Sequence, residues 1–143
     1  MRHLPMVALV VLLSGCQCFA PLRVSGSIQS GAVIEVQGSA DALSKRAGLQ
    51  HLGVYMQDGV GTKPAWLIRG SARVNSVTYG KVPPGMVEEA PAVPLEPGRK
   101  YSVGIEGDTA GTFFGPSCHG RASFTVDTAG KIIPCSEEGS ACG

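Results

Sequence analysis

The sequence predicts an all-β fold, and two observations indicate it. The chain of 143 residues contains 20 glycines and 10 prolines, which interrupt it at short intervals and favour strands joined by turns. Several short runs also alternate between apolar and polar residues. In the clearest run, residues 101–106, Tyr101, Val103 and Ile105 alternate with polar or small residues, which is the pattern of a strand with one buried face.

The same pattern locates the other strands, and turn residues separate them. Gln29-Ser30-Gly31 joins the first pair, Asp58 to Gly61 joins the second, and Asp127 to Gly130 marks a turn near the C-terminus. In chain order, we expect strands at residues 24–28, 32–36, 52–57, 65–69, 72–79, 101–106, 122–126 and 131–135.

Residues 39–48 depart from the strand pattern. Ser39 is a suitable N-cap, Asp41 lies in the first turn, basic residues follow, and Gly48 would end a helix. We expect one or two helical turns here. A helix of that length is marginal alone, so it would serve as a connection that packs against the sheets.

Residues 82–97 contain five prolines. Each proline removes a backbone donor from a strand ladder, so this segment cannot be a central strand. We expect an extended crossover between two sheets. The alternative is an exposed recognition segment, with Met86, Val87 and Val93 partly exposed.

The start of the chain has the organisation of a secretory signal. Arg2 supplies positive charge, residues 6–13 are all apolar, and the segment ends in Leu13-Ser14-Gly15-Cys16. These eight apolar residues would rise about 12 Å as a helix, against roughly 30 Å for the hydrocarbon core of a bilayer. The segment is therefore too short to span a membrane.

Leu13-Ser14-Gly15-Cys16 resembles the lipobox of bacterial lipoproteins. The resemblance implies cleavage after Gly15, acylation of the Cys16 sulfur, and attachment to a membrane through the acyl chains. Residues 1–15 would then be the signal peptide, 16–23 the lipidated tether and 24–143 the β domain. Gln17 in place of an aspartate implies the outer membrane, facing the periplasm. The alternative is a secreted protein in which Cys16 is an ordinary thiol.

The charge balance argues against nucleic acid as a partner. Removal of Arg2 with the leader reduces 12 basic residues to 11, against 11 acidic ones, so the mature chain has no net charge. It also lacks the basic stripe of a nucleic-acid binder and the polybasic cluster of a membrane-surface protein. The expected partners are the membrane, through the lipid anchor, and another envelope protein.

Four cysteines besides Cys16 are candidates for disulfides: Cys18, Cys118, Cys135 and Cys142. An even number in an oxidising compartment predicts two bridges, and four cysteines allow three connectivities. We favour Cys118 with Cys135 and Cys142 with Cys18. A metal site at Cys118, His119 and Cys135 lacks the paired spacing of zinc ligands, and adjacent Cys118 and His119 would point to opposite faces of a strand. We expect no metal or cofactor.

The segment Leu95-Glu96-Pro97-Gly98-Arg99-Lys100-Tyr101 resembles the tyrosine corner of fibronectin type III and related immunoglobulin-like sandwiches. In these folds Pro97 and Gly98 would turn the chain, Leu95 would pack inward, and the Tyr101 hydroxyl would bond to backbone a few residues upstream. The resemblance implies a β-sandwich, with Trp66 as a core aromatic. No cysteine follows two residues after Tyr101, so the inter-sheet disulfide of antibody domains is not expected.

No catalytic signature accompanies these features. His51 and His119 lie outside any H-E-x-x-H or G-x-S-x-G pattern, and Glu88-Glu89 falls in the proline-rich segment as a solvated charge pair. Trp66, the pair Tyr79-Gly80 followed by Pro83-Pro84-Gly85, the corner at Tyr101 and the hairpin at 124–130 also resemble small uncharacterised lipoproteins of Gram-negative bacteria. That resemblance implies no activity. We therefore expect a non-catalytic binding or accessory module of the cell envelope. The alternative is a protective factor against a toxin or a lytic enzyme.

Overall fold

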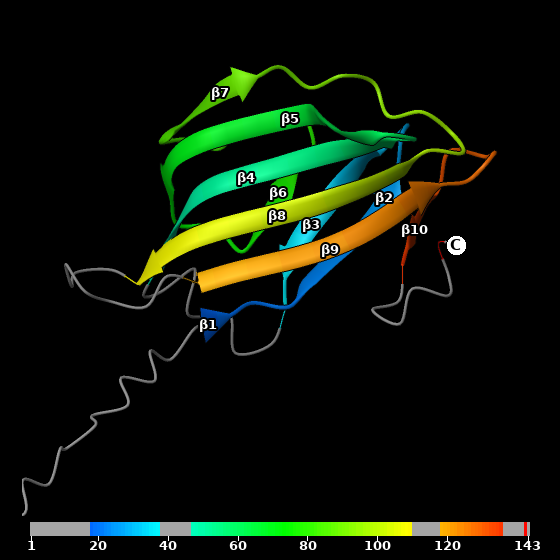
Figure 1. Ribbon diagram of the computed structural model, residues 1–143. Helices are drawn as coiled ribbons and strands as arrows, with labels where there is room; N and C mark the ends of the chain where they lie inside the picture. Colours follow the sequence, from blue (N-terminus) through cyan, green and yellow to red (C-terminus); the bar gives the residue numbers. More distant parts are fainter. Residues whose placement is uncertain (1–17, 38–46, 110–117, 136–141, 143) are drawn as a thin grey trace, which may run out of the picture.

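The computed structural model describes residues 18–37, 47–109, 118–135 and 142, and all regular structure in them is strand (Figure 1). The predicted all-β fold is confirmed. Within these ranges no helix has the length and apolarity that crossing a membrane requires. The strands are β1 (Cys18–Phe19), β2 (Leu22–Ser27), β3 (Gly31–Val36), β4 (Ala47–Asp58), β5 (Gly61–Ala72), β6 (Ser76–Thr78), β7 (Met86–Ala90), β8 (Lys100–Thr109), β9 (Cys118–Val126) and β10 (Ile132–Pro134).

The strands form two sheets in two layers, as Figure 1 shows. The larger, seven-stranded sheet has the order β1-β9-β8-β4-β5-β7, with β10 also paired to β9, and the smaller one has the order β2-β3-β6. All strand pairs are antiparallel except β1 with β9. The chain passes repeatedly from one sheet to the other, so consecutive hairpins such as β2–β3, β4–β5 and β8–β9 lie beside strands that are distant in sequence, as in the pairs β4–β8 and β3–β6. This is a β-sandwich.

The core lies between the sheets and follows from the alternation of apolar residues. Tyr101, Val103 and Ile105 on β8 are at most 3% exposed, as the alternation at 101–106 predicts. Val24 and Ile34 of the smaller sheet face them as part of one cluster. The largest fully buried side chains are Trp66, Tyr101, Phe124, Leu52 and Ile68.

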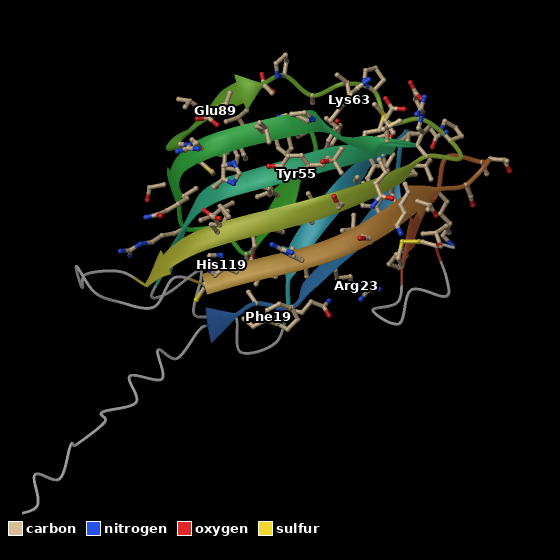
Figure 2. All side chains as sticks on the ribbon, in the orientation of Figure 1. Phe19, Arg23, Tyr55, Lys63, Glu89 and His119 are labelled. Atoms are coloured by element: carbon tan, nitrogen blue, oxygen red, sulfur yellow. A yellow bond between two sulfur atoms is a disulfide. The ribbon has the colours of Figure 1, made fainter. Side chains whose placement is uncertain are left out.

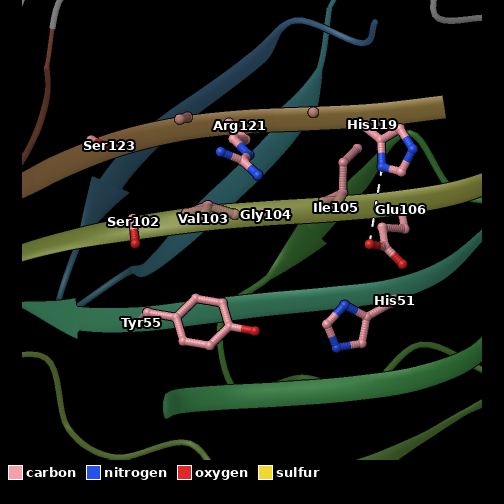
Figure 3. A pocket seen from close by; sticks show the side chains of 12 residues that line it. His51, Tyr55, Ser102, Val103, Gly104, Ile105, Glu106, His119, Arg121 and Ser123 are labelled. Carbon is pink, nitrogen blue, oxygen red and sulfur yellow. Dashed lines mark ion pairs between the residues drawn. The ribbon is translucent and has the colours of Figure 1, made fainter. Parts of the chain in front are cut away.

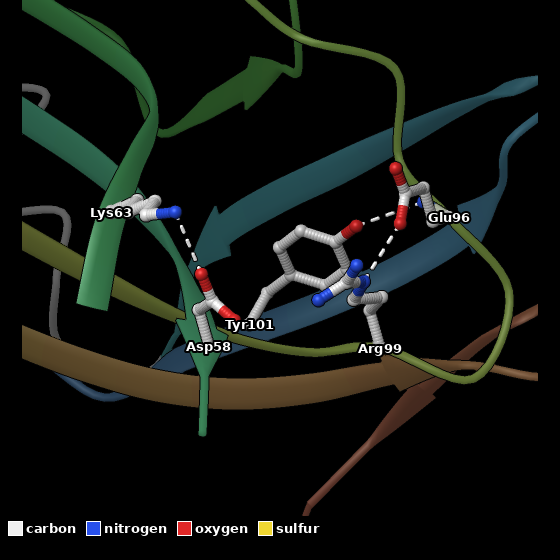
Figure 4. Close-up of polar contacts among 5 residues, drawn as sticks. All are labelled: Asp58, Lys63, Glu96, Arg99 and Tyr101. Carbon is white, nitrogen blue, oxygen red and sulfur yellow. Dashed lines mark hydrogen bonds and ion pairs between the residues drawn. The ribbon is translucent and has the colours of Figure 1, made fainter. Parts of the chain in front are cut away.

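A tyrosine corner precedes β8 (Figure 4). The Tyr101 hydroxyl accepts a hydrogen bond of 2.8 Å from the backbone N–H of Glu96, and the Tyr101 ring stacks on Phe124 with centroids 5.2 Å apart. Gly98 has φ of 79°, a left-handed conformation that favours glycine. Arg99 donates to the Glu96 carboxylate at 2.7 Å on the exposed side of the same turn. The corner thus fixes where β8 enters the larger sheet.

The second hairpin is longer than the sequence pattern suggests. β4 and β5 each run for 12 residues, and Lys63 pairs with Asp58 beside the turn. Pro64 lies within β5, at a register shift opposite Tyr55 and outside the part of β5 that pairs with β7. Its missing N–H therefore interrupts no ladder on that side. Of the predicted strand at 72–79, only Ser76–Thr78 forms a separate strand, β6, and Ala72 is the last residue of β5.

Most of the predicted helical segment, residues 39–46, lies outside the described residues. Its last two residues, 47 and 48, begin β4, where Gly48 pairs with Asp108 of β8. The helix prediction is wrong at this end. Gly48 continues a strand because the hydrogen-bonding edge of β8 extends to it.

The predicted crossover at 82–97 connects β6 of the smaller sheet with β8 of the larger one, and it also contains β7. This short strand pairs with β5 at the sheet edge and has no proline inside it. Met86 is buried rather than partly exposed, whereas Val87 is 65% and Val93 40% exposed. The prolines therefore flank the strand without interrupting it.

The folded body begins earlier than the boundary at residue 24 that we expect from the sequence. β1 begins at Cys18, Ala20 is 3% exposed, and the backbone N–H of Ala20 donates to the His119 carbonyl at 2.8 Å. Residues 18–23 of the predicted tether thus belong to the folded body, as β1, the start of β2 and the connection between them. Leu13, Ser14, Gly15 and Cys16 lie outside the described residues.

The favoured disulfide pairing is wrong. Cys135 is bonded to Cys142, with Cα atoms 5.4 Å apart, so neither pairs with Cys118 or Cys18. The register gives the reason, because Pro134 pairs with Phe124. Cys118 lies six residues from Phe124 along β9, which at about 3.3 Å per residue is about 20 Å. Cys118 is also in a disulfide, and the Cys18 backbone lies opposite it in the parallel pairing of β1 with β9.

Candidate ligand-binding site

A depression of about 470 Å³ lies on the face of the larger sheet that is turned away from the smaller sheet, here called the outer face (Figure 3). Strands β4, β8 and β9 contribute its residues. Small-ligand sites occupy roughly 300 to 1,000 Å³, so the size is suitable. The lining residues are His51, Tyr55, Ser102, Val103, Gly104, Ile105, Glu106, His119, Gly120, Arg121, Ala122 and Ser123.

The outward-facing residues of these strands lie in rows across the sheet. The strand register places Glu106 between His51 and His119, and places Gly104 between Gly53 and Arg121. Strand spacing of about 4.8 Å brings the members of a row within reach of one ligand. Residues distant in sequence thus converge on one surface. A further row contains Tyr55, Ser102 and Ser123.

Gly104 lowers the floor of the depression. A Cβ atom added at Gly104 would meet nothing within 4 Å, and Gly104 has no left-handed φ. Neither packing nor backbone conformation therefore requires glycine at this position. Glycine inside a strand is less stable than alanine by about 0.5–1 kcal/mol, and it is often found where another group approaches the backbone closely.

Gly53 has a different role, because the Tyr55 ring lies against it. A Cβ at Gly53 would be 2.7 Å from both the Cε2 atom and the hydroxyl oxygen of Tyr55. Figure 3 shows the ring lying along β4, with its hydroxyl directed toward His51 and one face open to the depression. Gly53 therefore lets the aromatic ring lie flat on the sheet.

The charged groups of the depression are only partly paired. The Glu106 carboxylate lies 4.0 Å from Nδ1 of His119, and both side chains are about half exposed. Arg121 has no ion-pair partner among the described residues. Figure 3 shows its guanidinium directed toward β8, over the floor that Gly104 leaves open. An unpaired guanidinium is suited to hold a carboxylate or a phosphate group.

A second depression of about 420 Å³ adjoins the first on the same face. His51 and Glu106 line both, and Gln50, Arg69 and Gly70 complete the second. Glu89 of β7 holds Arg69 at 2.9 Å. The two depressions form a polar surface that extends across the sheet from β9 to β5.

Cys118 and His119 are adjacent in β9 but lie in different environments. Cys118 is buried and bonded in a disulfide, whereas the adjacent His119 side chain is exposed on the outer face. Cys135 is also in a disulfide, so the sulfur atoms of this triplet are not available as thiolates. Among the described residues, no group of three or more His, Cys, Asp or Glu is placed to hold a metal ion.

The two glutamates of the proline-rich segment are exposed, as the sequence predicts, but each also has a partner. Glu88 accepts a hydrogen bond of 2.8 Å from the indole N–H of Trp66, and Glu89 forms the ion pair with Arg69. Trp66 is fully buried and contacts Tyr79 edge to face at 5.4 Å. Glu88 thus joins β7 to the core, and Glu89 joins β7 to Arg69 of β5 at the surface.

Sequence reasoning did not find the depression. It noted His51 and His119 separately and did not single out Tyr55, Glu106 or Arg121. The outward positions of β8 and β9 follow from alternation, but their alignment depends on strand register, which alternation does not determine. Comparisons with protein-family models, with curated proteins and with solved structures find no match to this chain.

Proposed function

We propose that this protein is a lipid-anchored binding module of the cell envelope that holds a ligand on the outer face of its larger sheet. It would be attached through Cys16 to the outer membrane and face the periplasm. The observation that carries the proposal is the open floor at Gly104. A glycine that the fold does not require lies here at the centre of converging polar and aromatic side chains.

The lipobox resemblance and the early start of the folded body support the anchor. β1 begins two residues after Cys16, so acyl chains on that sulfur would hold the sandwich directly at the bilayer surface. Phe19, which is 61% exposed, lies on this edge next to His119 in the register (Figure 2). An exposed aromatic ring is suited to the membrane interface.

The composition of the depression favours binding over catalysis. Glu106 is the only carboxylate among the described residues that line it. Glycoside cleavage by the common mechanisms uses two carboxylates across the bond. A nucleophilic serine needs a hydrogen-bonded base, and no such bond to Ser102 or Ser123 is present among the described contacts. The fibronectin-like corner before β8 is consistent with this proposal, since such sandwiches often serve as scaffolds for recognition.

The anchor is tested by labelling cells with radioactive palmitate. We expect label in the wild-type protein and none in Cys16→Ser, which should also lose its membrane fractionation. Cys16→Ser protein that keeps its label and its membrane fractionation would contradict the anchor.

The ligand site is tested by crosslinking in living cells. A photo-crosslinking residue replaces Ser123 at the rim of the depression, and in a control it replaces Arg23, which is exposed on the smaller sheet. We expect a defined product from position 123 alone, and its loss when Gly104→Val is added. Equal products from both positions, or none from position 123, would contradict the site.

A further inference from the structure

We infer that the ligand of the outer face is a saccharide that carries a carboxylate. This inference rests on the proposed function and names the chemical class that the depression selects. Three features lead to it: a flat aromatic ring, a mixture of donors and acceptors, and one unpaired guanidinium.

The aromatic ring provides an apolar platform beside polar groups. Because Gly53 has no side chain, the Tyr55 ring lies on the sheet and its face is accessible from the depression. Aromatic faces carry partial negative charge and attract the C–H bonds on the apolar face of a sugar ring. The hydroxyl of Tyr55 lies at the edge of the same platform, where it can bond to a sugar hydroxyl. This combination suits a pyranose ring better than a lipid chain, which needs an enclosed apolar pocket.

The surrounding groups match a ligand that both donates and accepts hydrogen bonds. Glu106 only accepts when ionised, Arg121 only donates, and the hydroxyls of Ser102 and Ser123 do both. Sugar hydroxyls also do both, so each of these groups finds a partner on one ligand. An added peptide strand would need unpaired backbone groups at a sheet edge. The β8 backbone in the depression is already paired with β4 and β9.

Arg121 indicates that the ligand carries an acidic group. Its guanidinium has no ion-pair partner among the described residues, and Figure 3 shows it directed over the open floor at Gly104. A planar guanidinium binds a carboxylate through two parallel hydrogen bonds. The depression has one such cation and also contains Glu106, so it is not the basic surface that a polyanion would require. A hydroxyl-rich ring with a single carboxylate satisfies both groups, because the carboxylate binds Arg121 and a ring hydroxyl donates to Glu106.

The adjoining depression indicates more than one sugar unit. It continues past His51 and Glu106 to Gln50 and to Arg69. Arg69 is already paired with Glu89, so it would contact the ligand as a hydrogen-bond donor and not as a free charge. The ligand would therefore be an oligosaccharide lying across the strands, with its acidic unit at Arg121.

The test uses the full-length protein in detergent on an array of oligosaccharides that contain uronic, muramic or sialic acids. Each oligosaccharide is also printed as its methyl ester, which keeps the shape and removes the charge. We expect binding to one or more acidic forms. Esterification should weaken it about tenfold or more, which corresponds to roughly 1.4 kcal/mol.

Matched variants assign the effect to the depression. Arg121→Gln should lose the preference for the acid over the ester, and Arg23→Gln, a charge change on the smaller sheet, should retain it. Gly104→Val should weaken binding about tenfold or more by filling the floor. Its control is Gly61→Val, since a Cβ at Gly61 also meets nothing within 4 Å and Gly61 is at the far end of the hairpin. Circular dichroism and urea unfolding verify that each variant is folded.

Three results would overturn the inference: no binding to any acidic saccharide, equal binding to the esters, or full binding by folded Gly104→Val. If no oligosaccharide on the array binds but the crosslink at position 123 persists, the inference of a saccharide ligand is refuted and the proposed ligand site is not. Loss of both would refute the proposed site itself.

Discussion

Single hydroxyl groups hold two parts of this sandwich together. The Tyr101 hydroxyl accepts from the Glu96 N–H, and the Tyr79 hydroxyl lies 2.7 Å from the carbonyl oxygen of Val93 and 3.0 Å from that of Ala65. Each ring is packed against another aromatic residue. Both tyrosines therefore fasten the long segment between β6 and β8 to the body of the protein.

Removal of the Tyr101 hydroxyl should be measurable. Tyr101→Phe keeps the stacked ring but leaves the Glu96 N–H without its acceptor, and we expect a loss of about 1–2 kcal/mol in the free energy of unfolding. Urea denaturation measures it. Tyr55→Phe is the control, because the Tyr55 hydroxyl makes no hydrogen bond among the described contacts, and it should change stability by less than about 0.5 kcal/mol. Equal effects of the two substitutions would refute the role of the corner.

Alkaline pH should destabilise the fold through the same phenols. Burial raises the pKa of Tyr79 and Tyr101, because an ionised oxygen would lose its solvation. In the unfolded chain these groups ionise near their ordinary pKa of about 10. The stability that they contribute is thus complete below about pH 10 and is lost as the pH rises toward the folded pKa.

Unfolding free energies measured by urea between pH 8 and 11 test this dependence. We expect a decline above about pH 10 in the wild type and a shallower decline in Tyr79→Phe, which starts from a lower value at pH 8. Identical slopes would show that Tyr79 is not responsible.

At the scale of elements, Glu88 joins β7 to the buried Trp66, and Glu89 joins it to the exposed Arg69. Glu88→Ala removes the acceptor of the buried Trp66 N–H, and we expect a loss of about 1–3 kcal/mol. Glu88→Gln retains an acceptor oxygen and should restore most of it. Glu89→Ala breaks only the exposed pair with Arg69 and should cost less than about 1 kcal/mol. Thermal unfolding of the three variants would contradict this account if Glu89→Ala were the more damaging.

The elements also show what the sequence can and cannot predict. Alternation located the first hairpin and β8 because one face of each strand is buried. The ends of β4 and β5 were missed, since Gly48 and Gly70 look like breaks but lie within strands that long neighbours extend. β7 was missed because surrounding prolines obscured a five-residue strand. The depression and the disulfide pairing were missed for one shared reason: both depend on register, and alternation is compatible with several registers.

At the scale of the whole molecule, the pairing of the cysteines bears on the proposed anchor. Cys135–Cys142 closes the C-terminal end, Cys118 is in a second disulfide, and Cys18 lies opposite Cys118 in the register. If Cys16 carries acyl chains, the partner of Cys118 must be Cys18. Mass spectrometry of peptides from the membrane-extracted, unreduced protein should show a Cys18–Cys118 link and an acylated Cys16. A Cys16–Cys118 link would exclude both.

The central claim is that the outer face of the larger sheet binds saccharides. The most direct measurement is an amide-resolved NMR titration of the isotope-labelled full-length protein in detergent micelles. The titrant is the mixture of oligosaccharides that enzymatic digestion releases from the envelope of the producing cell. We expect the amide signals of Gly53, Gly104 and Arg121 to shift progressively, while those of β2, β3 and β6 remain in place. Shifts confined to the smaller sheet, or none at any concentration, would contradict the claim.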